Sequence, residues 1–290
     1  MASTPELAAV VLHVRPHAVP TDRVLPRWWG RAAHALFLRA MAAVDAGLAE
    51  RLHRPDDAPR PFTVSTLMGP RAHAGLQPDA IYRLRFTAYS ATVAQALLAA
   101  VAPRGPLGPG ATIELDGVPF AVLPRDDAPS PWEGATTYPD LAGPWLTARQ
   151  TPPRHWTLRL ASPTTFRSGG VHVPFPLPAL VFGSLLQRWN AYAPIALPDE
   201  TRRFAAQAMA VSRYRLQSRA VPLKSGGLRI GAVGEVTYRA LNPDRYWRSV
   251  IQVLVAFARF AGVGGGTSFG LGQVRWSPPQ PSPSAEDVSS

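Results

Sequence analysis

The sequence contains no cysteine, and its only lysine is Lys224. The missing thiols exclude disulfides, thiol catalysis and thiolate metal sites. No segment approaches about 18 uninterrupted apolar residues, the length that a membrane-spanning helix needs. The N-terminus also lacks the basic region, apolar run and cleavage site of a secretory signal. We therefore expect a soluble, cytoplasmic protein that does not contact a membrane.

Acidic residues are scarce relative to basic ones. Among 290 residues, 30 Lys and Arg stand against 19 Asp and Glu, which gives a formal net charge of +11. A genomic bias towards arginine explains the missing lysines but not the net charge, because acidic residues were equally available. Since the planar arginine fork suits phosphate, this excess predicts a polyanionic partner, with nucleic acid as the first candidate. Hydrophobic residues make up 46%, so a sizeable core is available. A chain of 290 residues is long enough for one large domain or two of ordinary size.

Glycine is concentrated near the C-terminus. The stretch GVGGGTSFGLG, Gly262–Gly272, holds six glycines in eleven residues. The apolar segment Trp247–Ala261 precedes it, and the strand-like segment Gln273–Trp276 follows it. A dinucleotide-binding fingerprint requires the opposite order, with the strand first and the helix second. Two interpretations remain: a tight loop whose backbone N–H groups hold phosphate, or a glycine-rich helix stop without a ligand.

The first half of the chain predicts a ferredoxin-like domain, residues 1–124. A strand at Ala8–Val14 precedes a long helical region that opens at Pro26 and breaks near Gly47. Two extended segments, a helix and a strand pair follow, at Phe62–Leu67, Ile81–Ala88, Thr92–Val101 and Thr112–Leu123. This β-α-β-β-α-β order is typical of the ferredoxin-like fold.

The second half, residues 154–277, repeats the plan. Residues 125–153 are rich in proline, glycine and charge, and we interpret them as the connection between the domains, partly packed on a domain surface. The elements expected after it are a strand at His155–Leu160, an irregular loop at Thr164–Pro178, a helix at Ala179–Tyr192, a hairpin formed by Ala208–Val221 and Leu228–Ala240, and a last helix capped by Asn242. Residues 278–290 form a Pro/Ser tail that we expect to be disordered. The sequence thus predicts an α+β protein with two tandem ferredoxin-like domains and a C-terminal glycine-rich loop.

Two histidines are suited to acid–base chemistry. His34 lies within the first helical region and His53 lies at its end. Arginines flank both of them, at Arg27, Arg31, Arg54 and Arg60. Histidine exchanges a proton near neutral pH, so this set suits RNA cleavage by the internal 2′-hydroxyl, which needs proton transfer and charge stabilisation. The alternative is that His34 is a helix surface residue and His53 stabilises a helix C-terminus. The other histidines lack the partners and spacing of a metal site, so none is predicted.

A second basic cluster lies on the predicted hairpin. Arg213, Arg215 and Arg219 recur at even spacing and therefore share one face of a strand. Lys224 lies in the hairpin connection. Such a row suits the backbone of a nucleic acid, and the alternative is an ordinary solvated face.

Four stretches together resemble the CRISPR-associated endoribonucleases that cut precursor CRISPR RNA within its repeats, the Cas6 family of the RAMP superfamily. They are GVGGGTSFGLGQVRW (Gly262–Trp276), LAERLHRPDDAPRPFTVS (Leu48–Ser65), the helix VFGSLLQRWN (Val181–Asn190) and the arginine-rich hairpin through GAVGEVTYRA (Gly231–Ala240). The first two stretches are the most specific, especially together and in this order.

The resemblance implies metal-independent, cofactor-free cleavage of CRISPR repeat RNA, leaving 5′-hydroxyl and 2′,3′-cyclic phosphate ends. By motif position His53 matches the usual catalytic histidine, His34 a second one found in some members, and Arg60 a basic residue that stabilises the phosphate. Some members carry a tyrosine where Leu38 stands here, so a Tyr–His–Lys triad is not intact and the His34–His53 pair is preferred. The expected RNA-binding residues are Arg27, Arg31, Arg54, Arg213, Arg215, Arg219, Lys224, Gly264, Gly265, Gly266, Thr267, Ser268 and Gly270.

The alternative function is that of a non-catalytic RAMP-type subunit that binds guide RNA, for which His53 is not needed. A general RNA-binding protein with RRM-like domains is disfavoured, because the usual aromatic RNP pattern is not evident. The expected partners are repeat RNA or crRNA, other subunits of a CRISPR effector complex and a second copy of the chain.

Overall fold

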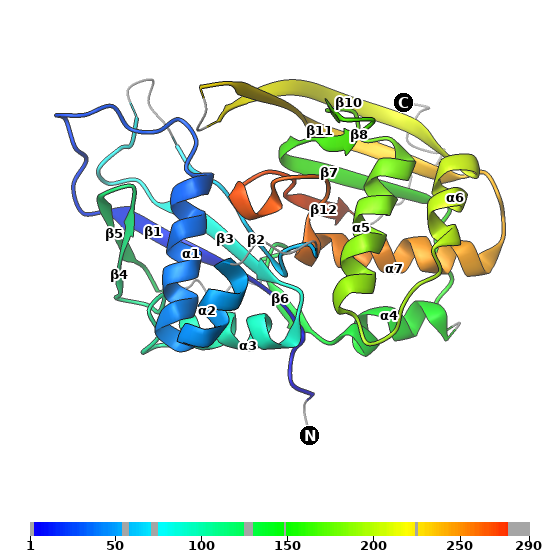
Figure 1. The fold of residues 1–290 in the computed structure, drawn as a ribbon, viewed down its shortest axis with the longest axis horizontal. Helices are drawn as coiled ribbons and strands as arrows, with labels where there is room; N and C mark the ends of the chain where they lie inside the picture. Colours follow the sequence, from blue (N-terminus) through cyan, green and yellow to red (C-terminus); the bar gives the residue numbers. More distant parts are fainter. Residues whose placement is uncertain are drawn as a thin grey trace, which may run out of the picture.

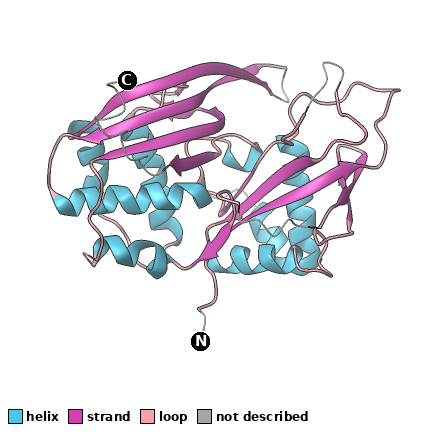
Figure 2. Ribbon diagram, turned by 180° about the vertical axis from the view of Figure 1, so that it is seen from behind, coloured by secondary structure: helices cyan, strands magenta, loops and turns pink. Residues whose placement is uncertain are grey.

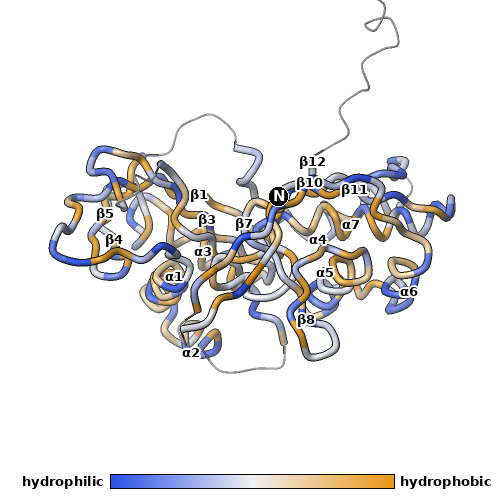
Figure 3. Tube along the Cα trace, turned by 90° about the horizontal axis from the view of Figure 1, so that it is seen from above, coloured by the Kyte–Doolittle hydropathy of each residue, from blue (hydrophilic) through white to orange (hydrophobic). Residues whose placement is uncertain are grey.

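The computed structural model describes residues 3–53, 58–70, 75–124, 130–147, 149–223 and 226–277. Arg54, Lys224 and the tail at 278–290 lie outside these ranges. Two lobes lie side by side, and each consists of an antiparallel sheet with helices packed on it (Figure 1). Apolar segments run through the interior of both lobes, whereas the outer loops are hydrophilic (Figure 3). In the described ranges, no helix combines the length and the apolar character that a membrane crossing requires.

The first lobe has the ferredoxin-like topology that the sequence predicts. Its elements are β1 (Leu7–Pro16), α1 (Gly30–Val44), α2 (Ala46–His53), β2 (Phe62–Val64), β3 (Tyr82–Ala88), α3 (Ala91–Ala100), β4 (Thr112–Leu115) and β5 (Val118–Val122). The strand order is β2-β3-β1-β5-β4, so β3 lies between the two strands that flank α1 and α2. The core of this lobe lies between the sheet and the helices α1 and α3, where Phe37, Phe62 and Phe86 pack together.

The second lobe repeats this topology around a longer hairpin. Its elements are β7 (His155–Thr164), β8 (Phe166–Ser168), β9 (Val171–Val173), α5 (Pro178–Tyr192), α6 (Glu200–Gln207), β10 (Met209–Pro222), β11 (Leu228–Ala240), α7 (Arg245–Ala261) and β12 (Val274–Ser277). The strand order β10-β11-β7-β12 matches that of the first lobe, and the two sheets are seen from behind in Figure 2. The predicted irregular loop at 164–178 contains the small β8–β9 hairpin, and α6 was not predicted.

Two helix starts differ from the sequence analysis. The first helix begins at Gly30 rather than at Pro26, and Asp45 separates α1 from α2. The last helix is capped by Asp244, whose carboxylate accepts a hydrogen bond from the Tyr246 N–H over 2.8 Å. Asn242 instead accepts from the Asp244 N–H. Asn and Asp side chains both suit an N-cap, so the position of the cap depends on where β11 ends.

The segment expected as a connection contributes to both lobes. Its strand β6 (Gly134–Thr136) pairs with β1, and its helix α4 (Tyr138–Leu146) packs on α7. Tyr138 is buried in the core of the second lobe, which agrees with the expectation that part of this segment packs on a domain.

A polar cluster joins the lobes where α7 ends against the first sheet. The buried Arg85 of β3 donates hydrogen bonds to the Trp132 carbonyl over 2.9 Å, to Gln273 Oε1 over 2.8 Å and to the Arg259 carbonyl. Gln273 Nε2 donates to Thr63 Oγ1 and the Val64 carbonyl. Burial lowers the pKa of Arg85 to about 9, so it remains charged at neutral pH. The lobes are therefore held in one arrangement by directional bonds as well as by apolar contact.

Candidate functional site

The glycine-rich loop crosses from the second lobe to the first and ends against α1. Its short helix η1 (Thr267–Phe269) contacts α1 and β2 (Figure 1). The indole N–H of Trp28 donates to the Phe269 carbonyl over 2.9 Å. At Gly30, a Cβ would lie 1.9 Å from that same carbonyl oxygen, so glycine is required there for the loop to approach the helix.

This approach fixes the orientation of His34. The His34 Nδ1–H donates to the Ser268 carbonyl over 2.8 Å, since a carbonyl oxygen only accepts. The imidazole stacks on Phe269 at a centroid distance of 4.3 Å and lies 5.6 Å from Phe62. With the proton held on Nδ1, the neutral ring has its lone pair on Nε2. Burial lowers the pKa of His34, and the nearby charges of Arg60 and His53 lower it further, so the neutral form dominates at pH 7.

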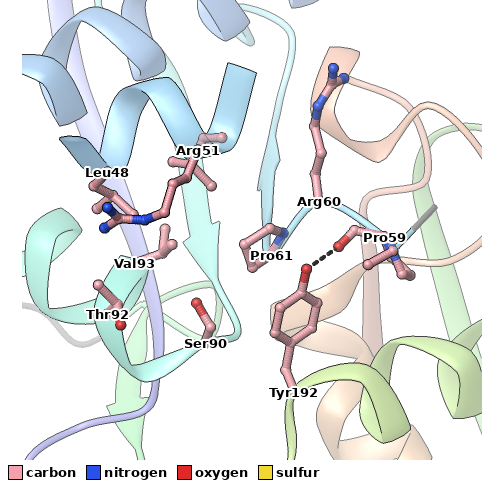
Figure 4. A pocket seen from close by; sticks show the side chains of 11 residues that line it. Leu48, Arg51, Pro59, Arg60, Pro61, Ser90, Thr92, Val93 and Tyr192 are labelled. Atoms are coloured by element: carbon pink, nitrogen blue, oxygen red, sulfur yellow. Dashed lines mark hydrogen bonds between the residues drawn. The ribbon is translucent and has the colours of Figure 1, made fainter. Parts of the chain in front are cut away.

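The Arg60 side chain approaches the same loop at Phe269. Its guanidinium lies 5.6 Å from the Phe269 ring centroid. Its backbone segment is held by two tyrosines: the Tyr89 hydroxyl donates to the Arg60 carbonyl, and the Tyr192 hydroxyl donates to the Pro59 carbonyl over 2.5 Å. This segment lines a pocket of about 700 Å³, from which the Arg60 side chain extends away (Figure 4). The side chain therefore projects from a fixed backbone towards the glycine-rich loop.

His53 is the last residue of α2 and is exposed to solvent. The structure thus brings His34 and Arg60 together at Phe269, and His53 is near enough to His34 for its charge to lower the pKa of His34. Their grouping agrees with the predicted catalytic set, although the role of each remains a proposal.

A hollow of about 760 Å³ opens beside His34. Among the described residues that line it, basic and aromatic side chains are prominent: Arg23, Trp28, Arg31, Arg39 and Phe269. Arg31 was expected at this site from the sequence. Arg23 and Arg39 were missed, as were the two aromatic residues, because only tertiary packing places them here. Arg27 is exposed just before α1 and is not among the residues that line the hollow.

The first part of the glycine loop differs from the expected row of bare N–H groups. The N–H of Gly265 donates to the Thr165 carbonyl over 2.8 Å, and that of Gly264 donates to Ser184 Oγ over 3.2 Å. Gly264, Gly266 and Gly270 all have positive φ, and Gly270 forms an isolated β-bridge with Ser65 of the first lobe. Thr267 and Ser268 are buried. These glycines are therefore needed for close packing, and their contact with RNA remains a prediction.

The hairpin arginines lie on an exposed edge strand. Arg213, Arg215 and Arg219 stand on β10, which pairs only with β11 within the described sheet. The sequence shows no acid between them, but the structure places Glu235 of β11 directly opposite Arg215. Arg159 of β7 is opposite Glu235, and Arg275 of β12 is opposite Arg159. The basic face thus extends across four strands and includes one acidic residue.

A family model described as CRISPR-associated endoribonuclease Cas6 matches residues 158–274. A curated Cas6 endoribonuclease of Mycobacterium tuberculosis is 32% identical over 131 residues, which are 44% of this chain and 40% of the relative. One of Streptococcus thermophilus is 24% identical over 130 residues, 42% of this chain and 50% of the relative. The matched region therefore spans about half, or less, of the length of these curated relatives.

Solved structures match almost the whole chain. A Cas6 product complex has a TM-score of 0.72 at 27% identity and covers 94% of this chain and 100% of the other. Thermus thermophilus Cas6 has a TM-score of 0.66 at 26% identity, with coverage of 95% and 100%. A Cas6 substrate mimic complex has a TM-score of 0.67 at 29% identity, also with coverage of 95% and 100%. The family model, the curated relatives and the solved structures all support the resemblance of this chain to the Cas6 family.

Proposed function

We propose that this protein is an endoribonuclease that cuts CRISPR repeat RNA to mature crRNA. The observation that carries the proposal is the position of His34, with Nδ1 bonded to the Ser268 carbonyl and the ring held against Phe269. This arrangement leaves Nε2 as a base, next to a hollow lined by three arginines together with Glu114 and Asp116. Among related proteins, Cas6 structures include a product complex and a substrate mimic complex, which supports RNA as the ligand here.

The proposed reaction is an attack by the 2′-hydroxyl on the adjacent phosphorus. His34 Nε2 takes the proton of the 2′-hydroxyl, and the 2′-oxygen forms a bond to phosphorus. The bond from phosphorus to the 5′-oxygen breaks, and protonated His53 gives its proton to that leaving oxygen. The products are a 2′,3′-cyclic phosphate and a 5′-hydroxyl.

Arg60 is assigned to the charge that develops on the phosphate oxygens. A guanidinium forms paired, charge-assisted hydrogen bonds with phosphate, and such bonds accelerate a reaction when they are stronger in the transition state. The stacking of its guanidinium on Phe269 restricts its position before RNA binds. In this scheme proton transfer is carried out by side chains, so we propose that cleavage needs no metal ion.

We further propose that the protein acts in the cytoplasm. Other subunits of a CRISPR effector complex and a second copy of this chain remain proposed partners.

The test uses a transcript of the CRISPR repeat from the same genome, with EDTA present and enzyme in excess. The wild-type protein is expected to cut at one position and to leave a cyclic phosphate. His34→Ala and His53→Ala are each expected to slow cleavage by roughly 10²-fold or more, the scale of lost acid–base catalysis, with nearly unchanged RNA affinity.

His155→Ala is the matched control, because His155 is an exposed histidine on β7 outside the proposed catalytic set. Cleavage by His53→Ala at the wild-type rate would remove His53 from the mechanism. Tight binding of the repeat by the wild type without any cleavage would favour the non-catalytic RAMP-type subunit.

A further inference from the structure

A second basic pocket lies at the start of the glycine-rich loop. Its volume is about 280 Å³, and the residues that line it include Gly264 and Gly265. Three arginines from three different elements also line it: Arg167 of β8, Arg188 of α5 and Arg202 of α6. No acidic side chain is among the described residues around it, so three positive charges converge without a carboxylate.

Arg188 is the buried member of this group. It is only 8% exposed, and its hydrogen bonds include those to the carbonyl of Gly264 and, over 3.1 Å, to that of Ser184, with Tyr89 as a further polar neighbour. Its Nε–H has no hydrogen-bond partner within the described structure. A buried guanidinium without an acidic partner is costly, because neutral carbonyls satisfy its hydrogen bonds but not its charge. An anion in the pocket would balance this charge.

The shape of α5 makes room for a second guanidinium. Gly183 lies in the interior of this helix, where glycine costs roughly 0.5–1 kcal/mol relative to alanine. A Cβ at this position would lie 3.1 Å from Nη1 of Arg202. The Arg202 head group therefore lies over the helix backbone at a position that a larger side chain obstructs.

The pocket adjoins the segment that carries Arg60. Pro59 lines it, and the next residue is Arg60. The glycine loop begins at this pocket and reaches His34 at Ser268 and Phe269. An extended RNA strand that followed the glycine-rich loop would pass both the pocket and His34.

We propose that this pocket binds a backbone phosphate of the RNA substrate, at a nucleotide other than the one that is cut. This proposal rests on the proposed function. The guanidinium forks of Arg167, Arg188 and Arg202 match phosphate geometry.

The test compares two neighbouring arginines of α6. Both side chains are exposed, but Arg202 lines the pocket and Arg203 does not, so Arg202→Gln and Arg203→Gln remove the same charge from the same helix. Affinity is measured over a salt series for the repeat transcript with a 2′-deoxynucleotide at the cut position. Arg202→Gln is expected to reduce the salt slope by about 0.7, the value for one lost contact on a single strand, and Arg203→Gln to leave it unchanged. Arg167→Gln is expected to act like Arg202→Gln.

Several outcomes overturn the proposal and separate it from the proposed function. Equal slopes for Arg202→Gln and Arg203→Gln, with a wild type that cuts the normal transcript, overturn the pocket assignment alone. A wild type that neither binds nor cuts the transcript overturns both. Thermal unfolding with AMP or inorganic phosphate distinguishes the source of the phosphate. A rise in Tm for the wild type but not for Arg202→Gln, with unchanged RNA slopes, assigns the pocket to a small ligand instead of RNA.

Discussion

The chemistry of His34 depends on contacts that are remote in sequence. Ser268 and Phe269 are supplied by the other lobe, and they fix the proton on Nδ1 and cover the ring. Both effects follow from packing: a carbonyl selects the tautomer, and burial disfavours the charged form. A histidine on the surface of the same helix has neither constraint.

The lowered pKa of His34 predicts the pH profile of cleavage. A base must be neutral to accept a proton, so the single-turnover rate is expected to rise with pH as His34 loses its proton. Because burial lowers the pKa, the midpoint of this rise should lie below the ordinary value of about 6.5. Phe269→Ala uncovers the ring and should move the midpoint upwards, towards 6.5.

Phe175→Ala serves as a control for that measurement, because Phe175 is an exposed aromatic residue that packs on Tyr214. An unchanged midpoint in Phe269→Ala would mean that the acid limb reports another group.

At the scale of elements, the glycines of the loop differ in how closely other atoms pack around them. At Gly264, φ is +73° and a Cβ would lie 2.3 Å from the Thr165 carbonyl. At Gly265, the closest atom is 3.8 Å away, and the residue is exposed. The density of glycine therefore reflects close packing at some positions and not at others.

Gly264→Ala is expected to lower the free energy of unfolding by about 2 kcal/mol or more, because it adds a steric clash to the cost of a left-handed backbone. Gly265→Ala is expected to change it by less than about 0.5 kcal/mol. Chemical denaturation measures both. Equal losses in the two variants would contradict the packing account. Weaker RNA binding by Gly265→Ala, with an unchanged Tm, would add direct RNA contact to the role of the loop.

Substitutions in the β10–β11 hairpin are predicted to lower or to raise RNA affinity, according to whether a basic or an acidic side chain is removed. If its face binds RNA, replacing Arg213, Arg215 and Arg219 with Gln should lower affinity and flatten its salt dependence. Glu235→Gln should raise affinity, because it removes the acid opposite Arg215. Fluorescence anisotropy at several salt concentrations measures both effects. A triple variant with the wild-type slope would show that this face is directed away from RNA.

At the scale of the whole molecule, the proposed catalytic set depends on the arrangement of the two lobes. Arg85 and Gln273 form the centre of the polar contact between them. Gln273→Ala is expected to destabilise the protein by about 1–3 kcal/mol, because Arg85 Nη1 loses its acceptor and the Val64 carbonyl and Thr63 Oγ1 lose a donor in a buried site. It should also slow cleavage, since the loop that holds His34 directly precedes Gln273.

Gln217→Ala is the control for this variant, as Gln217 is exposed on β10. Thermal unfolding and single-turnover cleavage are measured for both. If Gln273→Ala unfolds and cuts like the wild type, the polar contact does not set the arrangement of the lobes.

The sequence by itself determined the order of the elements and the residue types of the site. Apolar and β-rich runs identified β1, α3, α5 and the hairpin, because these elements are long and rich in residues that favour the structure they form. The motifs around His53 and Gly262–Gly272 identified the family and the catalytic candidates. The start of α1, the cap of α7 and the short elements β8, α4 and α6 were missed or misplaced, because local preferences there are nearly equal.

Only the tertiary structure decided how those residues act. It brought Ser268 and Phe269 to His34, buried Arg188 beside Gly264, and placed Glu235 opposite Arg215. None of these pairs is close in sequence, and they depend on the docking of the two lobes, on the packing of α5 against the glycine-rich loop and on the register of two strands. Periodicity describes which face of an element is buried, but the partner on that face is chosen by the packing of the whole chain.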